Sequence, residues 1–83
     1  MGKKKKLHKK AINSPTNLSF KELCSLAEYV GFEFRNQTGS HKIYKHPVIN
    51  EMINIQPEGN KAKPYQVRQL LGIIDKHGLD IGE

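Results

Sequence analysis

The chain has 83 residues and a formal net charge of +6, with 36% hydrophobic and 27% charged side chains. This length allows one small domain with a thin core, and the composition excludes an intrinsically disordered chain. No apolar run approaches the roughly 18 residues of a membrane span. No apolar segment follows the opening lysines as a secretion signal requires. The single cysteine, Cys24, cannot form an internal disulfide, which predicts a reducing, cytoplasmic compartment.

The positive charge is concentrated at the N-terminus. Residues 1–13 contain six lysines and no acidic residue, whereas residues 14–83 contain eight basic and eight acidic side chains. Within residues 35–68, six basic side chains stand against two acidic ones, a net charge of +4. A basic arm with a basic central band indicates a polyanionic partner such as nucleic acid, although a solubilising tail is the alternative for the arm. We therefore expect a flexible basic arm over residues 1–13 and a single domain over residues 14–83.

The first helix of the domain is predicted over residues 19–30. Ser19 and Glu22 have the spacing of a capping box, in which each side chain bonds the other residue's amide. Apolar residues then recur at helical spacing, and Gly31 follows where a left-handed residue ends a helix. In the arm, by contrast, the few apolar residues support a short marginal helix at best.

A second helix is predicted over residues 63–77. Pro64 suits the first turn of a helix, where its missing amide hydrogen costs nothing, and Gly78 marks the end. The apolar residues between them again recur at helical spacing.

Three strands are predicted between these helices, at residues 32–38, 41–46 and 52–56. The connections are short, which predicts an antiparallel meander because parallel strands need a long crossover. The expected fold is α+β, in the order α-β-β-β-α, with a three-stranded antiparallel sheet and two helices on one face. Its core is predicted to contain Phe20, Leu23, Phe34, Ile43, Ile55, Leu70 and Ile74.

His41 is the candidate catalytic residue. It directly follows the Gly39-Ser40 turn, where the backbone is exposed and the strand behind it holds the imidazole. Five side chains that we assign to RNA binding belong to the basic band: Lys42, Lys45, Lys61, Lys63 and Arg68. A histidine exchanges protons near neutral pH, and neighbouring cations stabilise phosphoryl charge. Together they supply what metal-free RNA cleavage requires.

The other histidines are assigned to other roles. His46 is five residues from His41, roughly 16 Å along a strand and on the opposite face, so the two cannot share one phosphate or one metal. His8 lies in the arm, and His77 lies beside a helix end, where a cation is favoured. No cysteine and histidine pair has zinc-ligand spacing, and the acidic residues do not cluster, so we expect neither a metal nor another cofactor.

At this point the sequence resembles a known family. The segments Phe20-Lys21-Glu22-Leu23, Gly31-Phe32 and Gly39-Ser40-His41-Lys42-Ile43-Tyr44 are similar to those of the HicA toxins of bacterial toxin–antitoxin systems. The later segments Ile55-Gln56-Pro57, Gly59-Asn60-Lys61 and Val67-Arg68-Gln69-Leu70-Leu71 follow in the family's order, so the resemblance covers about residues 18–79. It implies a fold like that of double-stranded-RNA-binding domains and cleavage of mRNA with His41 as the catalytic residue. It also implies inhibition by a cognate HicB-type antitoxin.

The expected mechanism is general acid–base catalysis. His41 would remove the proton of a ribose 2′-hydroxyl, which attacks the adjacent phosphate and leaves a 2′,3′-cyclic end. Many members of the family carry a second histidine after the catalytic one, where this chain has Lys42, so the proton donor stays open. Two alternatives also stay open: a non-catalytic RNA-binding module of the same fold, and a protein-interaction domain whose basic band meets an acidic partner.

Overall fold

A computed structural model describes residues 2–79 of the chain. Its helices are α1 (Lys3–Asn13), a short 3-10 helix η1 (Pro15–Asn17), α2 (Phe20–Tyr29) and α3 (Pro64–His77). Its strands are β1 (Glu33–Thr38), β2 (His41–Lys45), β3 (Met52–Ile55), β4 (Pro57–Glu58) and β5 (Lys61–Ala62). Met1 of the predicted arm and residues 80–83 of the predicted domain lie outside the described residues. No helix between residues 2 and 79 is long and apolar enough to span a bilayer.

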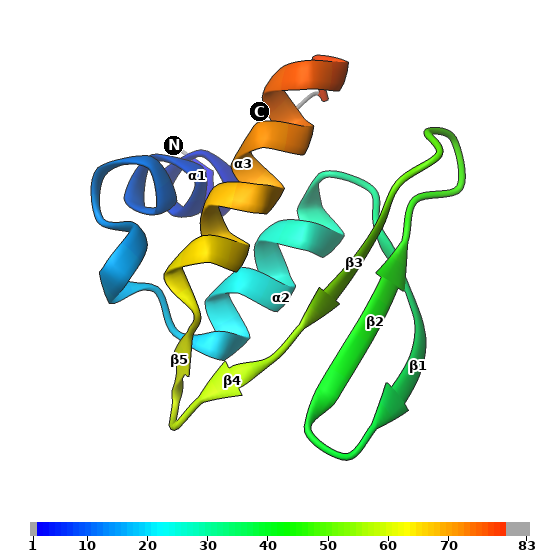
Figure 1. Cartoon of the computed structure of the whole chain (residues 1–83). Helices are drawn as coiled ribbons and strands as arrows, with labels where there is room; N and C mark the ends of the chain where they lie inside the picture. The colour runs from blue at the N-terminus through cyan, green and yellow to red at the C-terminus, as the bar shows by residue number, and fades with distance from the viewer. Residues whose placement is uncertain (1, 80–83) are drawn as a thin grey trace.

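The predicted antiparallel meander is confirmed. The strands are ordered β1-β2-β3, with Thr38 opposite His41 in the first pair and Lys42 opposite Ile55 in the second. Helix α2 lies across one face of this sheet, and α3 lies beside α2 at the β3 edge (Figure 1). The α+β class and the order of elements within residues 20–77 are therefore as predicted. An additional two-stranded hairpin, β4–β5, lies between β3 and α3, where the sequence predicted no strand.

Both predicted ends of α2 are confirmed. The Ser19 hydroxyl accepts a hydrogen bond from the Glu22 amide at 3.0 Å, and the Glu22 carboxylate accepts one from the Ser19 amide at 3.0 Å. After the helix, Gly31 has a φ of +105°, which a side chain rarely adopts. A Cβ atom at Gly31 would also lie 2.6 Å from Nε2 of His46, so this position requires glycine for space as well.

The predicted core is partly confirmed and partly wrong. Leu23, Ile55, Leu70 and Ile74 are buried, and Phe20 is half-buried against them. Phe34, however, is 51% exposed. It lies on the edge strand β1, all of whose residues are exposed.

Strand β2 presents a different face to the helices from the one expected. Ile43 was predicted to be in the core but is only half-buried, whereas its neighbour Tyr44 is 2% exposed. Successive side chains of a strand point to opposite faces, so burial of Tyr44 directs Ile43 to the outer face. The Tyr44 hydroxyl donates a hydrogen bond to the Glu28 carboxylate of α2 at 3.1 Å, which satisfies the polar group that burial would otherwise leave without a partner.

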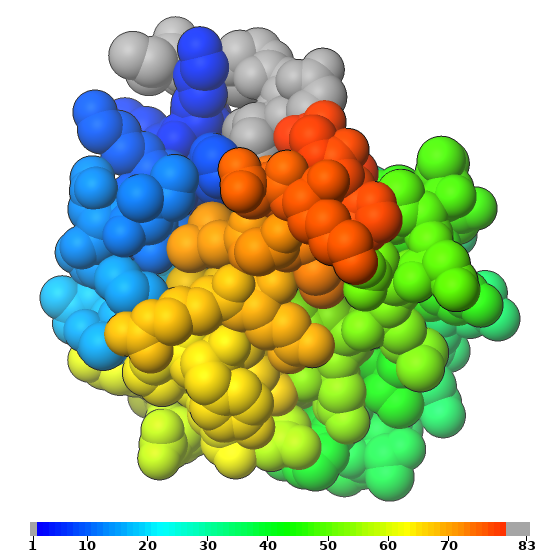
Figure 2. Space-filling view, turned by 45° about the horizontal axis from the view of Figure 1, so that its top comes forward, coloured from blue at the N-terminus to red at the C-terminus, as the bar shows by residue number. Residues whose placement is uncertain are grey.

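Residues 3–13 form a helix rather than the expected flexible arm. Ala11 is fully buried and Leu7 packs against the core, one helical turn apart. The Lys10 ammonium lies 2.9 Å from the Glu22 carboxylate, and the Lys4 ammonium lies 5.8 Å from the centre of the Tyr29 ring. An isolated helix of this length is marginal in water, so these contacts with the domain supply what the local sequence lacks. In the space-filling view α3 lies between α1 and the strands (Figure 2).

Candidate active site

His41 is the first residue of β2 and pairs with Thr38 across the turn from β1. Gly39, within the turn, has a φ of +61° and an open space where a Cβ atom would stand, so its requirement is conformational. The Gln37 side-chain amide donates to the Gly39 carbonyl at 3.1 Å and closes the turn. The imidazole of His41 is half-buried. It is thus fixed by the strand and open to a ligand on one side.

A side-chain cluster links His41 to the start of α3. Nδ1 of His41 lies 3.4 Å from Nε2 of Gln56, the residue that follows β3. The Oε1 atom of Gln56 accepts a hydrogen bond of 2.8 Å from the ammonium of Lys63, the N-cap residue of α3. Because an ammonium only donates, Lys63 fixes the orientation of the Gln56 amide and turns its nitrogen toward His41. The structure therefore places a histidine, an amide and a cation in one row.

The buried side chain of Gln66 positions this row. Its Oε1 accepts from the Gln56 backbone amide at 2.8 Å, and its Nε2 donates to the Asn54 carbonyl at 2.6 Å. One glutamine thereby bonds the free edge of β3 as a neighbouring strand would, and it is only 3% exposed. It ties the first turn of α3, and with it Lys63, to the end of β3 beside His41.

The predicted RNA-binding residues are not all near His41. Lys42 is adjacent in the chain, and its ammonium lies 5.7 Å from the centre of the Phe20 ring of α2. Lys63 is in the cluster. Lys61 is exposed in β5, where it pairs with Glu58.

Lys45 and Arg68 occupy other positions. Lys45 lies at the far end of β2, roughly 13 Å from His41 at the rise of a strand, opposite Glu33 and Met52. Arg68 is exposed on α3, about one turn beyond Pro64. Of the predicted RNA-binding residues, Lys63 therefore joins His41 in the cluster, whereas Lys42 points to the opposite face of β2 and Lys45 lies at the other end of the strand.

His46 has a structural role at the other end of the sheet. It is 7% exposed, and its Nδ1 accepts from the backbone amides of Val48 at 3.1 Å and Ile49 at 3.3 Å. Its Nε2 lies 3.0 Å from the Val30 carbonyl and must donate to it, because Nδ1 already accepts. The ring also meets Phe32 edge-on at 5.2 Å. This histidine closes a loop onto the end of α2 and is not free to move protons to a ligand.

The buried hydroxyl and thiol groups beneath the sheet are not activated as nucleophiles. Burial raises the pKa of the Tyr44 phenol, and the nearby Cys24 and Glu28 side chains raise it further. Burial also raises the pKa of the Cys24 thiol. Both groups are therefore protonated near neutral pH and serve the packing of α2 on the sheet.

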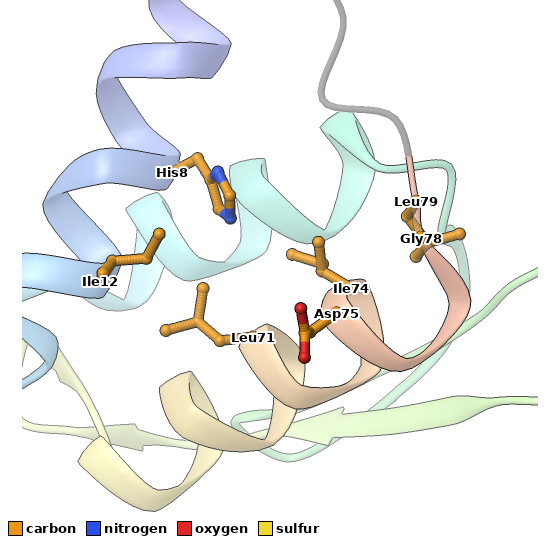
Figure 3. A pocket seen from close by; sticks show the side chains of 7 residues that line it. All are labelled: His8, Ile12, Leu71, Ile74, Asp75, Gly78 and Leu79. Carbon is orange, nitrogen blue, oxygen red and sulfur yellow. The ribbon is translucent and has the colours of Figure 1, made fainter.

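Two further properties of the described part of the chain bear on its chemistry. Among residues 2–79, no three histidine, cysteine or acidic side chains lie close enough together to hold a metal ion. A hollow of about 750 Å³ lies between α1 and the end of α3, and side chains of both helices face it (Figure 3). Its lining residues are His8, Ile12, Leu71, Ile74, Asp75, Gly78 and Leu79. It lies at the opposite end of α3 from Lys63.

Gln56 and Gln66 are the residues of the site that the sequence did not identify. Gln56 belongs to a segment that carries the family resemblance, but no role followed from it. The alternation of β3 gives the only sequence signal, because it directs Gln56 to the face opposite Ile55. Gln66 is a buried polar residue within the apolar stripe of α3. A buried polar side chain requires hydrogen-bond partners, which is the signal that it has a specific role.

Comparison with known proteins gives one family. The family model described as the HicA toxin of bacterial toxin–antitoxin systems matches residues 20–78. Neither a curated protein nor a solved structure gives a significant match. The matched region begins at the first residue of α2 and ends just after α3, so it contains the His41 cluster and leaves α1 outside.

Proposed function

The chain belongs to the HicA toxin family of bacterial toxin–antitoxin systems, and we propose that it is an endoribonuclease that cleaves mRNA with His41 as its catalytic residue. Toxins of this family are RNases. The observation that carries the proposal is the row of His41, Gln56 and Lys63 at one end of the sheet. It provides a proton-exchanging group beside a cation, on the strand end where the backbone is accessible.

The proposed reaction is transesterification followed by release of the cleaved end. The 2′-oxygen of a ribose attacks the adjacent phosphorus, the bond to the 5′-oxygen breaks, and a 2′,3′-cyclic phosphate forms. His41 accepts the proton of the 2′-hydroxyl, and the leaving 5′-oxygen takes a proton from a donor that we leave unassigned. Lys63 offsets the charge that develops on the phosphoryl oxygens. In this scheme all the chemistry is done by side chains, without a metal.

The Gln56 amide supports a link between substrate binding and the tautomer of His41. With its oxygen held by Lys63, Gln56 presents N–H to Nδ1, so the neutral imidazole carries its proton on Nε2. A phosphate that draws Lys63 away frees the amide to turn and to accept from Nδ1–H. Nε2 then carries the lone pair that a general base needs. The RNA phosphate would thus prepare the histidine that acts on it.

The test compares His41→Ala with His77→Ala, a second histidine at the opposite end of α3. His77 is exposed and bonded to Glu51 at 2.8 Å, so its loss leaves the cluster intact. We expect His41→Ala to lose about 10²-fold or more in RNA cleavage, the usual scale for acid–base catalysis, with binding much less affected. Cleavage, RNA affinity and thermal midpoint are measured on one preparation, with chelator present. His46→Ala is unsuitable as a control because its ring is buried and bonded to three backbone groups.

The outcomes separate the remaining alternatives. Cleavage by His41→Ala at the parental rate means that another residue is catalytic. Binding of RNA by the parent without cleavage selects a non-catalytic RNA-binding module, and neither activity selects a protein-interaction domain. Cleavage that is lost in chelator and restored by a divalent ion contradicts the metal-independent mechanism.

We further infer that a HicB-type antitoxin inhibits the chain in the cytoplasm by covering the face that carries His41. The support is the family, since a nuclease that attacks the host's own mRNA needs an inhibitor. In the complex, His41 should be shielded from carbethoxylation by diethyl pyrocarbonate, while exposed His77 should react as in the free chain. Equal reaction of His41 in the free and bound states would rule out coverage of this face.

A further inference from the structure

The groove between α1 and α2 concentrates positive charge. It has a volume of about 340 Å³, and its charged lining consists of four lysines and one glutamate, a net charge of +3. Lys3, Lys6 and Lys10 come from α1, and Lys21 comes from α2. The one acid, Glu22, already bonds Lys10. Lys3, Lys6 and Lys21 therefore face the groove, and the Glu22 carboxylate that bonds Lys10 does not bond them.

The walls of the groove are held in place by the packing of α1. Lys10 contacts the first turn of α2 through Glu22, and Lys4 contacts the last turn through the Tyr29 ring, so the two helices run antiparallel. Ala11 of α1 is fully buried and belongs to the core cluster. The lysines on this helix are therefore presented on a fixed support and not on a mobile tail.

The spacing of the lysines suits a nucleic-acid strand. Lys3 and Lys10 are seven residues apart on one helix, which places them about 10 Å apart along its axis. A length of about 10 Å spans more than one phosphate of a strand, since each strand of a duplex carries a phosphate about every 3.4 Å along the axis. Ser25 and Tyr29, on the α2 side, add hydroxyl groups that can bond phosphate oxygens.

The groove continues toward the candidate active site. Lys21 lines both this groove and a second hollow, of about 330 Å³, between the start of α2 and the β4–β5 turn. Phe20 also lines the second hollow, and its ring contacts the ammonium of Lys42, the neighbour of His41. Lys21 therefore joins the groove to the second hollow, and that hollow is lined by the Phe20 ring that Lys42 contacts, in the strand that begins with His41.

We propose that the α1–α2 groove binds the phosphate backbone of the RNA on one side of the scissile bond. The proposal rests on the RNA substrate proposed above and assigns a function to a helix outside the region that the family model matches. The groove holds the flanking strand by its phosphates, so it adds affinity for long RNA without selecting a sequence. An RNA too short to reach from His41 to α1 gains nothing from it.

The test uses two double variants with the same change of charge. Lys6→Gln/Lys21→Gln removes one lysine from each wall of the groove, while Lys5→Gln/Lys9→Gln removes two exposed α1 lysines that do not line it. Glutamine keeps the helix propensity of lysine, and circular dichroism checks that α1 persists. All proteins in this experiment also carry His41→Ala, so that the RNA stays intact during the measurement. The binding result then does not depend on whether the chain cleaves RNA.

The measurement is the salt dependence of RNA binding. The probe is a fluorescent RNA of about twenty nucleotides, which exceeds the 33 Å length of the molecule even at the axial rise of a duplex strand, about 3.4 Å per nucleotide. We expect the groove variant to reduce the slope of log affinity against log salt by about 1.4, since each contact with single-stranded RNA contributes about 0.7. The control variant should change the slope by less than half as much.

Three results would overturn the proposal. One is an equal change of slope in both variants, which means that only total charge matters. Another is an unchanged slope in the groove variant. The third is a groove variant that loses affinity for an oligoglutamate peptide but not for RNA, which would make the groove a protein-docking site. The two proposals can also fail separately. If the protein that retains His41 does not cleave RNA, but the groove variant still shows a reduced salt slope of RNA binding, the ribonuclease proposal fails and the groove proposal stands.

Discussion

Replacing Gln66 by leucine should destabilise the domain more than its size suggests. Leucine fills a similar volume but leaves the Gln56 amide and the Asn54 carbonyl without the side chain that bonds them. Each unpaired backbone group costs about 1–3 kcal/mol when buried, and water can reach this edge of β3 in part, so we expect a total of about 2 kcal/mol. In a domain of this size that lowers the thermal midpoint by about 8–16 °C. Thermal and urea unfolding, followed by circular dichroism, measure the effect.

Gln69→Leu is the matched control for this experiment. Gln69 is an exposed residue of the same helix, so the same substitution changes propensity and hydrophobicity without touching β3. It should alter the free energy of unfolding by less than about 0.5 kcal/mol, as surface substitutions do. If Gln66→Leu and Gln69→Leu unfold at the same temperature, the two hydrogen bonds do not hold α3 to the sheet. The reasoning that positions Lys63 through them would then fail.

Three further predictions concern other buried or capped groups. His46→Ala should cost about 2–4 kcal/mol in urea unfolding, because a cavity is left and the backbone groups that the ring bonds lose their partner; a loss under about 1 kcal/mol would contradict the structural role. The Ser19 backbone N–H donates to the Glu22 carboxylate and lowers the pKa of that carboxyl from 4.5. The ionised Glu22 carboxylate therefore stabilises the fold above pH 4.5, and this stabilisation is lost as pH falls through the lowered folded-state pKa. Glu22→Gln should flatten the acid limb of the stability curve, and identical acid limbs would exclude this origin. Cys24 is buried and its thiol pKa is raised, so alkylation should follow global unfolding in urea; fast labelling of the native chain would show that α2 opens locally.

Local signals in the sequence were sufficient for the helix ends and the sheet topology. The bonds of the capping box join residues three apart, and the stop at Gly78 depends on one left-handed residue with a φ of +59°. Short connections leave an antiparallel meander as the only arrangement of three strands. These features are fixed by neighbours in the chain, so a single sequence reveals them.

Helix α1 could not be predicted with the same means. Its own sequence has six lysines and only three apolar residues in eleven positions, and an isolated helix of this length is marginal in water. Its stability comes from burial of Ala11 and from the partners that Lys4 and Lys10 find on α2. Each of these partners is 12 or more residues away along the chain. A local sequence pattern does not reveal contacts between residues that far apart in the chain.

The face of β2 was predicted wrongly for a related reason. Lys42 and Tyr44 point one way, and His41, Ile43 and Lys45 the other, so the strand offers two half-apolar faces. The aliphatic residue was the natural choice for the core. Tyr44 is buried instead, because the Glu28 carboxylate on α2 accepts a hydrogen bond from its hydroxyl and so satisfies the polar end of the larger ring.

The register of the sheet ties the candidate site to the core. Ile53 and Ile55 are buried opposite Tyr44 and Lys42, and Gln56 is the next residue after Ile55. A slip of one residue between β2 and β3 would expose both isoleucines, so hydrophobic burial strongly selects the observed pairing. The same pairing brings Gln56 beside His41, fifteen positions away in the chain. The histidine could therefore be identified from its own turn, whereas its amide partner becomes visible only when the core fixes which residues lie across the strand.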